Sequence, residues 1–255
     1  MTDAIPPGPV PERVAIVTGA AGGIGGAVVR LLRERGYAII AEDISPAVAD
    51  LAEDGIVLPL EADVARTESA QRAVAMAVEW FGRLDLLVNN AGLFLRKPTQ
   101  QCTDEDFDAL MATNVRGAFV HARESLDALA QTSGSIVNLA SISGLVGMPN
   151  QTIYSITKGA IVQLTRQLAV EHAYRGIRVN AVAPGAVDTE FIAHARDAAA
   201  DPDPAASRAA AISNHPIGRI LTADEVAEAI VFLASAAASG ITGTILSVDG
   251  GYVAR

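Results

Sequence analysis

Residues 14–25 read VAIVTGAAGGIG, an apolar run that ends in a cluster of glycines. Val14–Val17 is apolar at every position, as expected for a parallel strand that is buried on both faces. From Ala27 to Arg35 the apolar residues take helical spacing, arginines occupy the last turn, and Gly36 ends the helix. This stretch therefore predicts a strand, a tight glycine turn and a helix, the unit with which many α/β domains begin.

Strand and helix patterns alternate along the rest of the chain. The further predicted strands are Tyr37–Glu42, Ile56–Leu60, Leu84–Val88, Ser135–Leu139, Ile177–Val182 and Thr244–Val248, and the further helices are about Arg66–Phe81, Thr103–Leu129, Tyr154–Tyr174 and Ala223–Ser235. Strands that alternate with helices form parallel sheets through right-handed crossovers. The pattern predicts a single α/β domain, a doubly wound seven-stranded parallel sheet (Rossmann fold) with helices on both faces.

Two segments interrupt this alternation. Residues 1–11 are rich in proline and predict a flexible tail, so the Rossmann domain should span residues 12–255. Residues 188–220 are longer than an ordinary connection, which rarely exceeds about 15 residues. Their centre, Asp201–Pro204, opposes a helix. Because long insertions at the carboxyl ends of sheet strands often cover ligands, we predict a mobile substrate flap here, with a plain surface excursion as the alternative.

Composition excludes several classes of protein. The chain is 50% hydrophobic and 19% charged, which is typical of a globular protein, and its net charge of -10 disfavours nucleic acid as a partner. It contains no signal-peptide pattern and no apolar run of the ~18 residues that a membrane span needs. With Cys102 as the single cysteine and no metal-ligand spacing among the histidines, we expect a cytoplasmic protein without a metal that binds a small molecule.

The glycine cluster also has a chemical implication. Glycines let the backbone approach a pyrophosphate closely, and the N-terminus of the following helix offers free N–H groups. Gly19, Gly23, Ile24 and Gly25 are therefore candidate dinucleotide contacts, with a purely structural turn as the alternative. Asp43 ends the second predicted strand, where a carboxylate accepts hydrogen bonds from the adenosine ribose and repels a 2′-phosphate. With no lysine or arginine in the loop or beside Asp43, NAD is favoured over NADP, and a turn-capping role for Asp43 is the alternative.

A second cluster of chemical groups begins the helix predicted at Tyr154–Tyr174. Residues 154–158 read YSITK, so Tyr154 and Lys158 share one helical face. An adjacent ammonium favours the phenolate and lowers a phenol pKa that starts near ~10, which suits a general acid or base. Ser141, just beyond the fifth predicted strand, can hold the substrate oxygen. A Tyr-x3-Lys pair alone often arises by chance, so its weight depends on the other motifs.

In combination these motifs resemble the short-chain dehydrogenase/reductase family over about residues 12–252. The family's motifs occur in order as Thr18–Gly25 (TGxxxGxG), Asp63–Val64, Asn89–Gly92 (NNAG), Asn114, Ser141, Tyr154-x3-Lys158, Pro184–Gly185, Thr189 and Val248–Gly251. Ala140 departs from the family, because many members have a second serine there. Ser141 is thus the candidate of that pair.

The resemblance implies a role for each matched residue. Tyr154 would exchange a proton with the substrate, Lys158 would lower the pKa of Tyr154 and hold the nicotinamide ribose, and Ser141 would orient the substrate. Asn114 would hold a water that links Lys158 to solvent. The implied cofactor contacts are Gly19, Gly23, Ile24, Gly25, Asp43, Asp63, Val64, Asn90, Ala91, Gly92, Tyr154, Lys158, Pro184, Gly185, Val187 and Thr189. The cofactor supplies the redox chemistry, and the protein supplies position and electrostatics.

The substrate pocket should be mostly apolar. Its candidate residues are Leu93, Phe94, Leu95, Ser143, Leu145, Met148, Gln151, Phe191 and His194, with Ser141, Ser143, Gln151 and Tyr154 as the expected substrate contacts. Such a lining suits a neutral substrate of modest size. Arg96 and Lys97 can meet an anionic substrate or belong to a solvated loop.

Three functions compete on these observations. We expect an NAD-dependent oxidoreductase acting on a secondary alcohol or ketone, with Tyr154 as general acid/base. The alternatives are a 3-oxoacyl-[acyl-carrier-protein] reductase and a non-catalytic NAD-binding sensor. The helix at Tyr154–Tyr174 is apolar on more than one side, and with the family resemblance this predicts a homotetramer. The helix at Thr103–Leu129 and the last strand are expected to join the contacts.

Overall fold

The structure is a computed structural model that describes residues 11–53, 55–189 and 203–254. Its centre is a seven-stranded sheet in the order β3-β2-β1-β4-β5-β6-β7, with every neighbouring pair parallel. The strands are β1 (Arg13–Thr18), β2 (Tyr37–Asp43), β3 (Val57–Glu61), β4 (Leu86–Asn89), β5 (Ser135–Leu139), β6 (Arg178–Pro184) and β7 (Ile245–Val248). The predicted doubly wound fold is confirmed.

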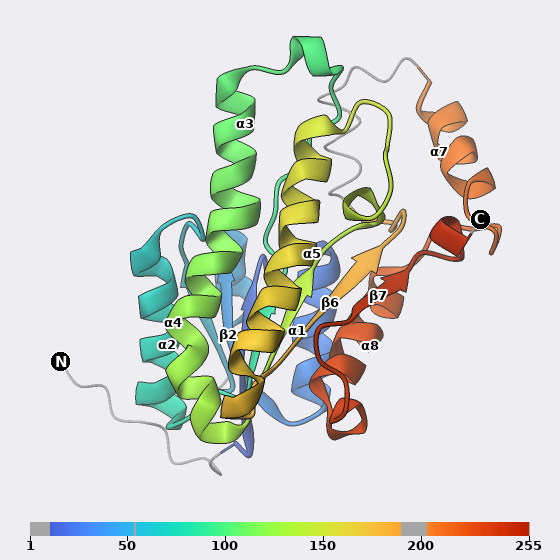
Figure 1. The fold of residues 1–255 in the computed structure, drawn as a ribbon. Helices are drawn as coiled ribbons and strands as arrows, with labels where there is room; N and C mark the ends of the chain where they lie inside the picture. The colour runs from blue at the N-terminus through green and yellow to red at the C-terminus, as the bar shows by residue number, and fades with distance from the viewer. Residues whose placement is uncertain (1–10, 54, 190–202, 255) are drawn as a thin grey trace.

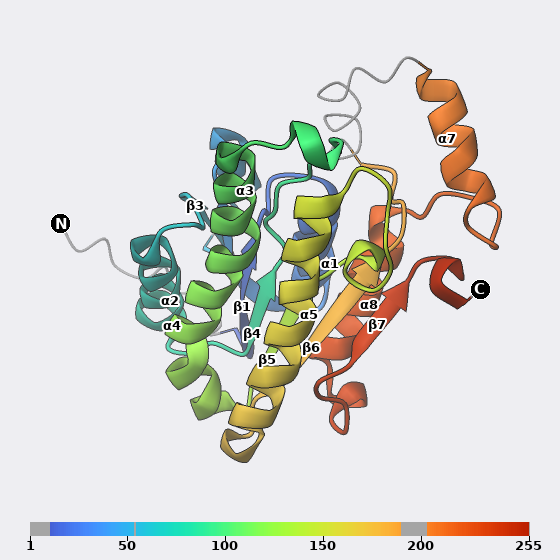
Figure 2. The same ribbon diagram turned by 45° about the horizontal axis from the view of Figure 1, so that its top comes forward.

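Helices cover both faces of the sheet (Figure 1, Figure 2). They are α1 (Gly23–Glu34), α2 (Thr67–Phe81), α3 (Asp104–Leu110), α4 (Gly117–Thr132), α5 (Thr152–His172), α7 (Pro204–Ser213) and α8 (Ala223–Ala234). Alternate residues of β1 face opposite sides: Ala15 and Val17 pack in a core with α1 and α8, while Val14 and Ile16 pack in a second core with α2, α4 and α5. The uniformly apolar strand pattern thus reflects burial on both faces.

The predicted long helix at Thr103–Leu129 is wrong in one respect, because the structure divides it. Between α3 and α4 lies a π-helical segment, Met111–Arg116, that contains the buried Asn114. A π-helical turn changes the angular position of the residues that it carries and often occurs at functional sites. Here it lets Asn114 reach the loop after β4 while α4 keeps its apolar face on the sheet.

The expectation that Asp201–Pro204 opposes a helix is wrong at its end, since α7 begins there. Asp203 is the N-cap and accepts a hydrogen bond from Ala206 N at 2.9 Å, and Pro204 takes the first helical position. Proline is favoured at that position because its missing N–H has no partner in a helix. Residues 190–202 of the predicted flap and residues 1–10 of the predicted tail lie outside the described part of the chain.

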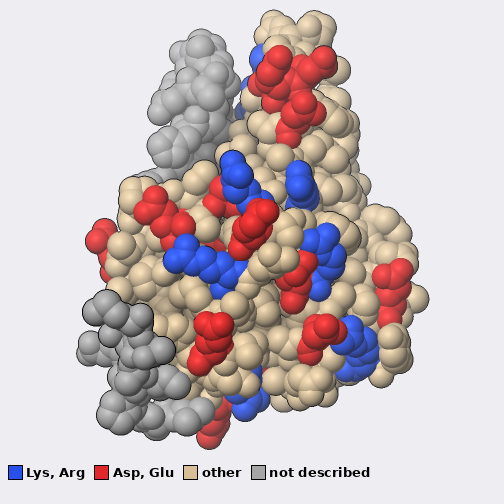
Figure 3. Space-filling view, turned by 90° about the vertical axis from the view of Figure 1, so that its left-hand side faces the viewer, with Lys and Arg blue, Asp and Glu red and all other residues tan. Residues whose placement is uncertain are grey.

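Surface charge and helix length bear on possible partners. On the face that carries α2 and α4, basic and acidic side chains are intermixed (Figure 3). Within the described ranges, none of the helices is both long and apolar enough to cross a membrane. The same residues contain no group of three or more histidine, cysteine or acidic side chains that could hold a metal ion.

Candidate active site

A large cavity lies at the carboxyl ends of the parallel strands, where ligands bind in open α/β sheets. Its volume is about 1510 Å³, and it extends from Asp43 to the first turn of α5. Of the predicted cofactor, catalytic and substrate residues, all line it except Gly25 and Asn114, which lie behind its wall. Among the predicted pocket residues, Leu95 and Leu145 do not line it, and Phe191 and His194 lie outside the described residues.

The glycine loop is shaped by close contact with the segment after β4. Gly19 has a φ of +66°, and a Cβ there would lie 2.8 Å from the Cα of Ala91. At Gly25 a Cβ would lie 1.8 Å from the carbonyl oxygen of Gly19. Asn90 fixes the loop, because its side-chain Nδ2 donates to the carbonyl oxygens of Thr18 at 3.0 Å and Gly19 at 2.9 Å. Gly25 therefore serves the turn itself.

The N-terminus of α1 opens into the cavity and fits a pyrophosphate. Its N-cap is Gly22, which offers no side-chain hydrogen bond to the first-turn N–H groups, and Gly22, Gly23 and Ile24 all line the cavity. A Cβ at Gly23 would lie 3.4 Å from the Thr189 side chain, so the loop faces the opposite wall closely. Free N–H groups at a helix N-terminus attract anions.

Asp43 caps the turn after β2 and also faces the cavity, so its predicted contact with the ribose stays a prediction. Its carboxylate accepts backbone hydrogen bonds from Ala21 N and Ser45 N, each at 2.9 Å, which is the turn-capping alternative. The same carboxylate lines the cavity, and each oxygen keeps a lone pair for a ribose hydroxyl. Among the described lining residues the cations are Arg96, Lys158 and Arg208, none of which comes from β1, β2 or their following loops.

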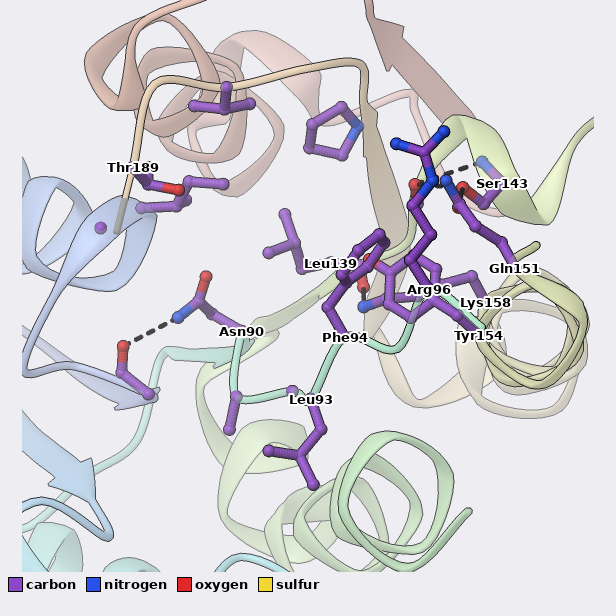
Figure 4. A pocket seen from close by; sticks show the side chains of 18 of the residues that line it. Asn90, Leu93, Phe94, Arg96, Leu139, Ser143, Gln151, Tyr154, Lys158 and Thr189 are labelled. Atoms are coloured by element: carbon purple, nitrogen blue, oxygen red, sulfur yellow. Dashed lines mark hydrogen bonds between the residues drawn. The ribbon is translucent and has the colours of Figure 1, made fainter. Parts of the chain in front are cut away.

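The predicted catalytic side chains meet at the other end of the cavity (Figure 4). Tyr154 and Lys158 are both buried on α5, and the Lys158 Nζ lies 5.7 Å from the centre of the Tyr154 ring. The Ser141 hydroxyl lies close enough to Tyr154 to lower the pKa of the phenol. The Lys158 Nζ donates to the carbonyl oxygen of Leu139 at 2.6 Å. These contacts place a phenol, a hydroxyl and an amine around one point of the cavity wall.

Burial controls the ionisation of this pair. Desolvation raises the pKa of Tyr154 above its ordinary value, and the neighbouring Ser141 hydroxyl lowers it by a smaller amount. Burial is therefore the largest influence on the pKa of Tyr154, and the lowering by Lys158 that the family resemblance implies stays a prediction. Burial also lowers the pKa of Lys158 to about 8.

Asn114 does not line the cavity, but its side chain bonds to residues that lie next to it. Its Oδ1 accepts from Leu93 N at 2.6 Å, and its Nδ2 donates to Leu93 O at 2.9 Å and to Thr157 Oγ1 at 3.0 Å. A Cβ at Gly92 would lie 3.3 Å from Asn114 Oδ1 and 3.8 Å from Lys158 Nζ. Glycine at that position thus keeps open the space between the two polar groups.

Ser143 and Gln151 extend the hydrogen bonding from Ser141. Ser143 N donates to Ser141 Oγ at 3.2 Å, Ser141 Oγ donates to Ser143 Oγ at 3.3 Å, and Ser143 Oγ donates to Gln151 Oε1 at 2.7 Å. All three side chains line the cavity. The relay directs the Ser141 O–H toward Ser143 and so leaves the Ser141 oxygen free to accept from a group in the cavity.

Comparison with known proteins gives the same interpretation. A family model described as enoyl-(acyl carrier protein) reductase matches residues 19–253. The cis-4-hydroxycyclohexanecarboxylate dehydrogenase of Sinomonas cyclohexanicum is 42% identical over 95% of this chain and 97% of its own. The chain belongs to the short-chain dehydrogenase/reductase family. It is an oxidoreductase of that family that acts on CH–OH groups.

Two further relatives of this dehydrogenase differ in function and cofactor. The 3-oxoacyl-[acyl-carrier-protein] reductase FabG of Thermotoga maritima is 37% identical over 94% of this chain and 98% of its own. The structure of ElxO with NADP bound superposes with a TM-score of 0.86 and 33% identity, covering 95% of this chain and 99% of that one. The family therefore includes NADP-bound members, and the choice of cofactor depends on local residues.

His215 supports the far wall of the dehydrogenase's cavity and was missed by sequence reasoning. Its Nε2 accepts from Ala186 N at 3.0 Å, and its Nδ1 donates to Ala211 O in α7 at 2.6 Å. A Cβ at Gly185 would lie 2.5 Å from this ring. The ring is buried and packs against Tyr252 at 5.3 Å between centroids. The sequence predicts no role for His215, because no local pattern connects it with Ala186.

Replacing His215 by alanine should destabilise the protein by about 1–3 kcal/mol, because it removes a buried ring and leaves the part-buried Ala186 N–H without its acceptor. Glutamine can place Oε1 near the position of Nε2, so His215→Gln should recover part of the loss. Urea denaturation of the three proteins measures this. Equal midpoints for the wild type and His215→Ala would show that the bond contributes nothing.

Proposed function

We propose that the protein is an NAD-linked dehydrogenase that interconverts a small secondary alcohol and its ketone. The observation that carries this is the buried Tyr154, beside Ser141 and Lys158, at one end of a cavity whose other end has a glycine loop and Asp43. The nicotinamide, when bound, supplies the hydride acceptor or donor. Gly19, Gly23, Ile24, Asp43, Asp63, Val64, Asn90, Ala91, Gly92, Pro184, Gly185, Val187 and Thr189 would hold the cofactor.

The chain's own groups then handle the proton. Ser141 holds the alcohol oxygen, and its relay through Ser143 to Gln151 fixes the direction of the hydroxyl. Tyr154 takes the alcohol proton during oxidation and returns it during reduction. Lys158, as an ammonium, stabilises the phenolate electrostatically, and Asn114 holds Leu93 and the space beside Gly92 through which a water can reach Lys158.

The activity is tested with purified protein, NAD and a panel of secondary alcohols. The panel contains cis- and trans-4-hydroxycyclohexanecarboxylate, a sugar, a hydroxysteroid and short hydroxy acids, and NADH absorbance is the measurement. The FabG relative makes a 3-oxoacyl reductase the second candidate, so an acetoacetyl thioester with NADPH is included. The complete set of Asn114, Ser141, Tyr154 and Lys158 argues against a pure sensor, which needs no proton relay.

Cofactor preference is the first quantitative prediction. NAD should exceed NADP by at least about tenfold in kcat/KM, or about 1.4 kcal/mol, because the Asp43 carboxylate repels a 2′-phosphate. Steady-state rates with both cofactors measure the preference. Asp43→Ala should reduce it, whereas Asp50→Ala, which removes an exposed carboxylate after the same strand, should leave it unchanged. Equal rates with both cofactors in the wild type would refute this prediction.

A homotetramer remains our proposal for the assembly. The structure narrows the predicted apolar surface of α5, since Ile161, Val162, Leu168 and Ala169 are buried within the subunit. Ile156 on α5 and Phe119 on α4 stay 47% and 45% exposed, and the two helices lie on the same face (Figure 1). Light scattering at micromolar concentration should give several times the 26.3 kDa of one chain. A mass near one chain would refute the assembly, and a dimer would refute only the tetramer.

Two further proposals concern the flap and the compartment. Residues 188–220 are proposed to close over the substrate, and the described part shows Asp188 paired with Arg208 of α7 at 3.1 Å, which connects α7 to the cavity wall.

The single cysteine, Cys102, allows no internal disulfide, and this fits the reducing cytoplasm.

A further inference from the structure

The substrate end of the cavity combines an apolar lining with one charged side chain. Phe94 packs edge-on against Tyr154 with ring centres 4.7 Å apart. Leu93, Met148 and Tyr252 line the same region, and the Tyr252 hydroxyl donates to the Met148 sulfur at 3.3 Å. These side chains can enclose a hydrocarbon body next to the reacting oxygen.

Arg96 differs from the other cations of the cavity. Lys158 is buried beside Tyr154, and Arg208 is bonded to Asp188 through both terminal nitrogens, at 3.1 and 3.2 Å. Arg96 forms no ion pair with any carboxylate of the described residues. Figure 4 shows its side chain extending into the pocket from the loop that also carries Leu93 and Phe94.

Lys97, the next residue along the chain, differs from Arg96 in both pairing and position. Its Nζ pairs with Asp106 at 2.6 Å, and its backbone N donates to Asn150 O, so it stabilises the loop and does not line the cavity. The described carboxylates that line the cavity are Asp43, Asp63 and Asp188, of which the first two lie at the adenosine end and the third is paired. A ligand near Tyr154 therefore meets positive charge from Arg96 and Lys158.

We propose that the substrate carries an anionic group, a carboxylate or a group of similar size, and that Arg96 binds it. A guanidinium presents two parallel N–H donors to a carboxylate, which gives orientation as well as affinity. With the anion at Arg96, the apolar body lies against Phe94 and Leu93, and the alcohol reaches Ser141 and Tyr154. This identifies the substrate class as hydroxy acids and rests on the proposed function. It replaces the sequence-based expectation of a neutral substrate.

The test compares matched substrates that differ only in charge. The probes are 4-hydroxycyclohexanecarboxylate and 3-hydroxybutyrate, each with its carboxamide, assayed with NAD. The wild type should prefer the carboxylate of at least one pair. Arg96→Met should lower kcat/KM for that carboxylate by about tenfold, mainly through KM, and change the carboxamide by less than about twofold, because only the anion loses a charge-assisted bond. Lys97→Met removes a positive charge next to Arg96 and should leave the ratio between the two substrates unchanged.

Each other outcome overturns the proposal. It is wrong if the wild type uses carboxamides as well as carboxylates in both pairs, if Arg96→Met lowers both substrates equally, or if Lys97→Met has the same effect as Arg96→Met. Turnover of uncharged alcohols from the panel without turnover of the hydroxy acids refutes the role of Arg96 and leaves the dehydrogenase function standing. Absence of turnover with every alcohol and both cofactors refutes the proposed function itself.

Discussion

Tyr154→Phe is expected to lower kcat by at least about 100-fold, the lower range for the loss of a general acid or base. The substitution keeps the ring that packs against Phe94 and removes only the hydroxyl. The substrate oxygen then has no group to exchange its proton with. Binding of NAD should change little, because the cofactor contacts proposed around Asp43 and the glycine loop are untouched.

The measurement is single-turnover NADH formation, with NAD affinity determined separately by fluorescence or calorimetry. Tyr37→Phe is the matched control, since this buried tyrosine begins β2, at the opposite end of the strand from the cavity, and its hydroxyl accepts a hydrogen bond from Arg13 at 3.2 Å. It should keep full activity. If Tyr154→Phe retained most of the wild-type rate, another residue would have to supply the proton.

The parts of the site that sequence could predict are those coded by local spacing. The glycine loop requires a strand before it and a helix after it, and the structure gives Gly19 a positive φ and Gly25 no room for a side chain. Likewise, four residues along a helix bring Tyr154 and Lys158 to one face. In these cases the backbone alone determines the relative positions, so a short motif is sufficient.

The missed features depend on contacts between distant segments. His215 reaches Ala186 only because the segment after α7 meets the loop after β6, and no periodicity predicts that. The Asn114 side chain reaches Leu93 through a π-helical segment, which an apolar pattern with helical spacing cannot distinguish from α-helix. The pKa of Tyr154 follows burial more than the neighbouring ammonium, because the Lys158 side chain is directed to Leu139.

Lys158→Met is expected to abolish most of the activity and yet stabilise the protein at neutral pH. The ammonium is buried, and desolvation lowers its pKa from 10.5 to about 8. The folded protein therefore binds the Lys158 proton less tightly than the unfolded chain does. This difference lowers the free energy of unfolding at every pH where the lysine of the unfolded chain is charged. Below pH 8 the loss is complete and amounts to about 3 kcal/mol, and it disappears as the pH rises from about 8 toward 10.5.

Methionine has no such cost, so the variant should be more stable than the wild type by about 1–3 kcal/mol at pH 7, less the hydrogen bond that Leu139 O loses. This difference in stability between the variant and the wild type should shrink as the pH rises to 9.5. The measurement stops there because Tyr37 and Tyr154, whose pKa values are raised in the folded protein, lower the stability when they titrate at higher pH. Urea denaturation at several pH values measures both effects. The only other lysine, Lys97, is part-exposed and paired, so Lys97→Met should not remove the pH dependence. A Lys158→Met protein that is less stable than the wild type at pH 7, or that keeps the wild-type rise between pH 8 and 9.5, would show that Lys158 is not held as a costly buried cation for the sake of the reaction.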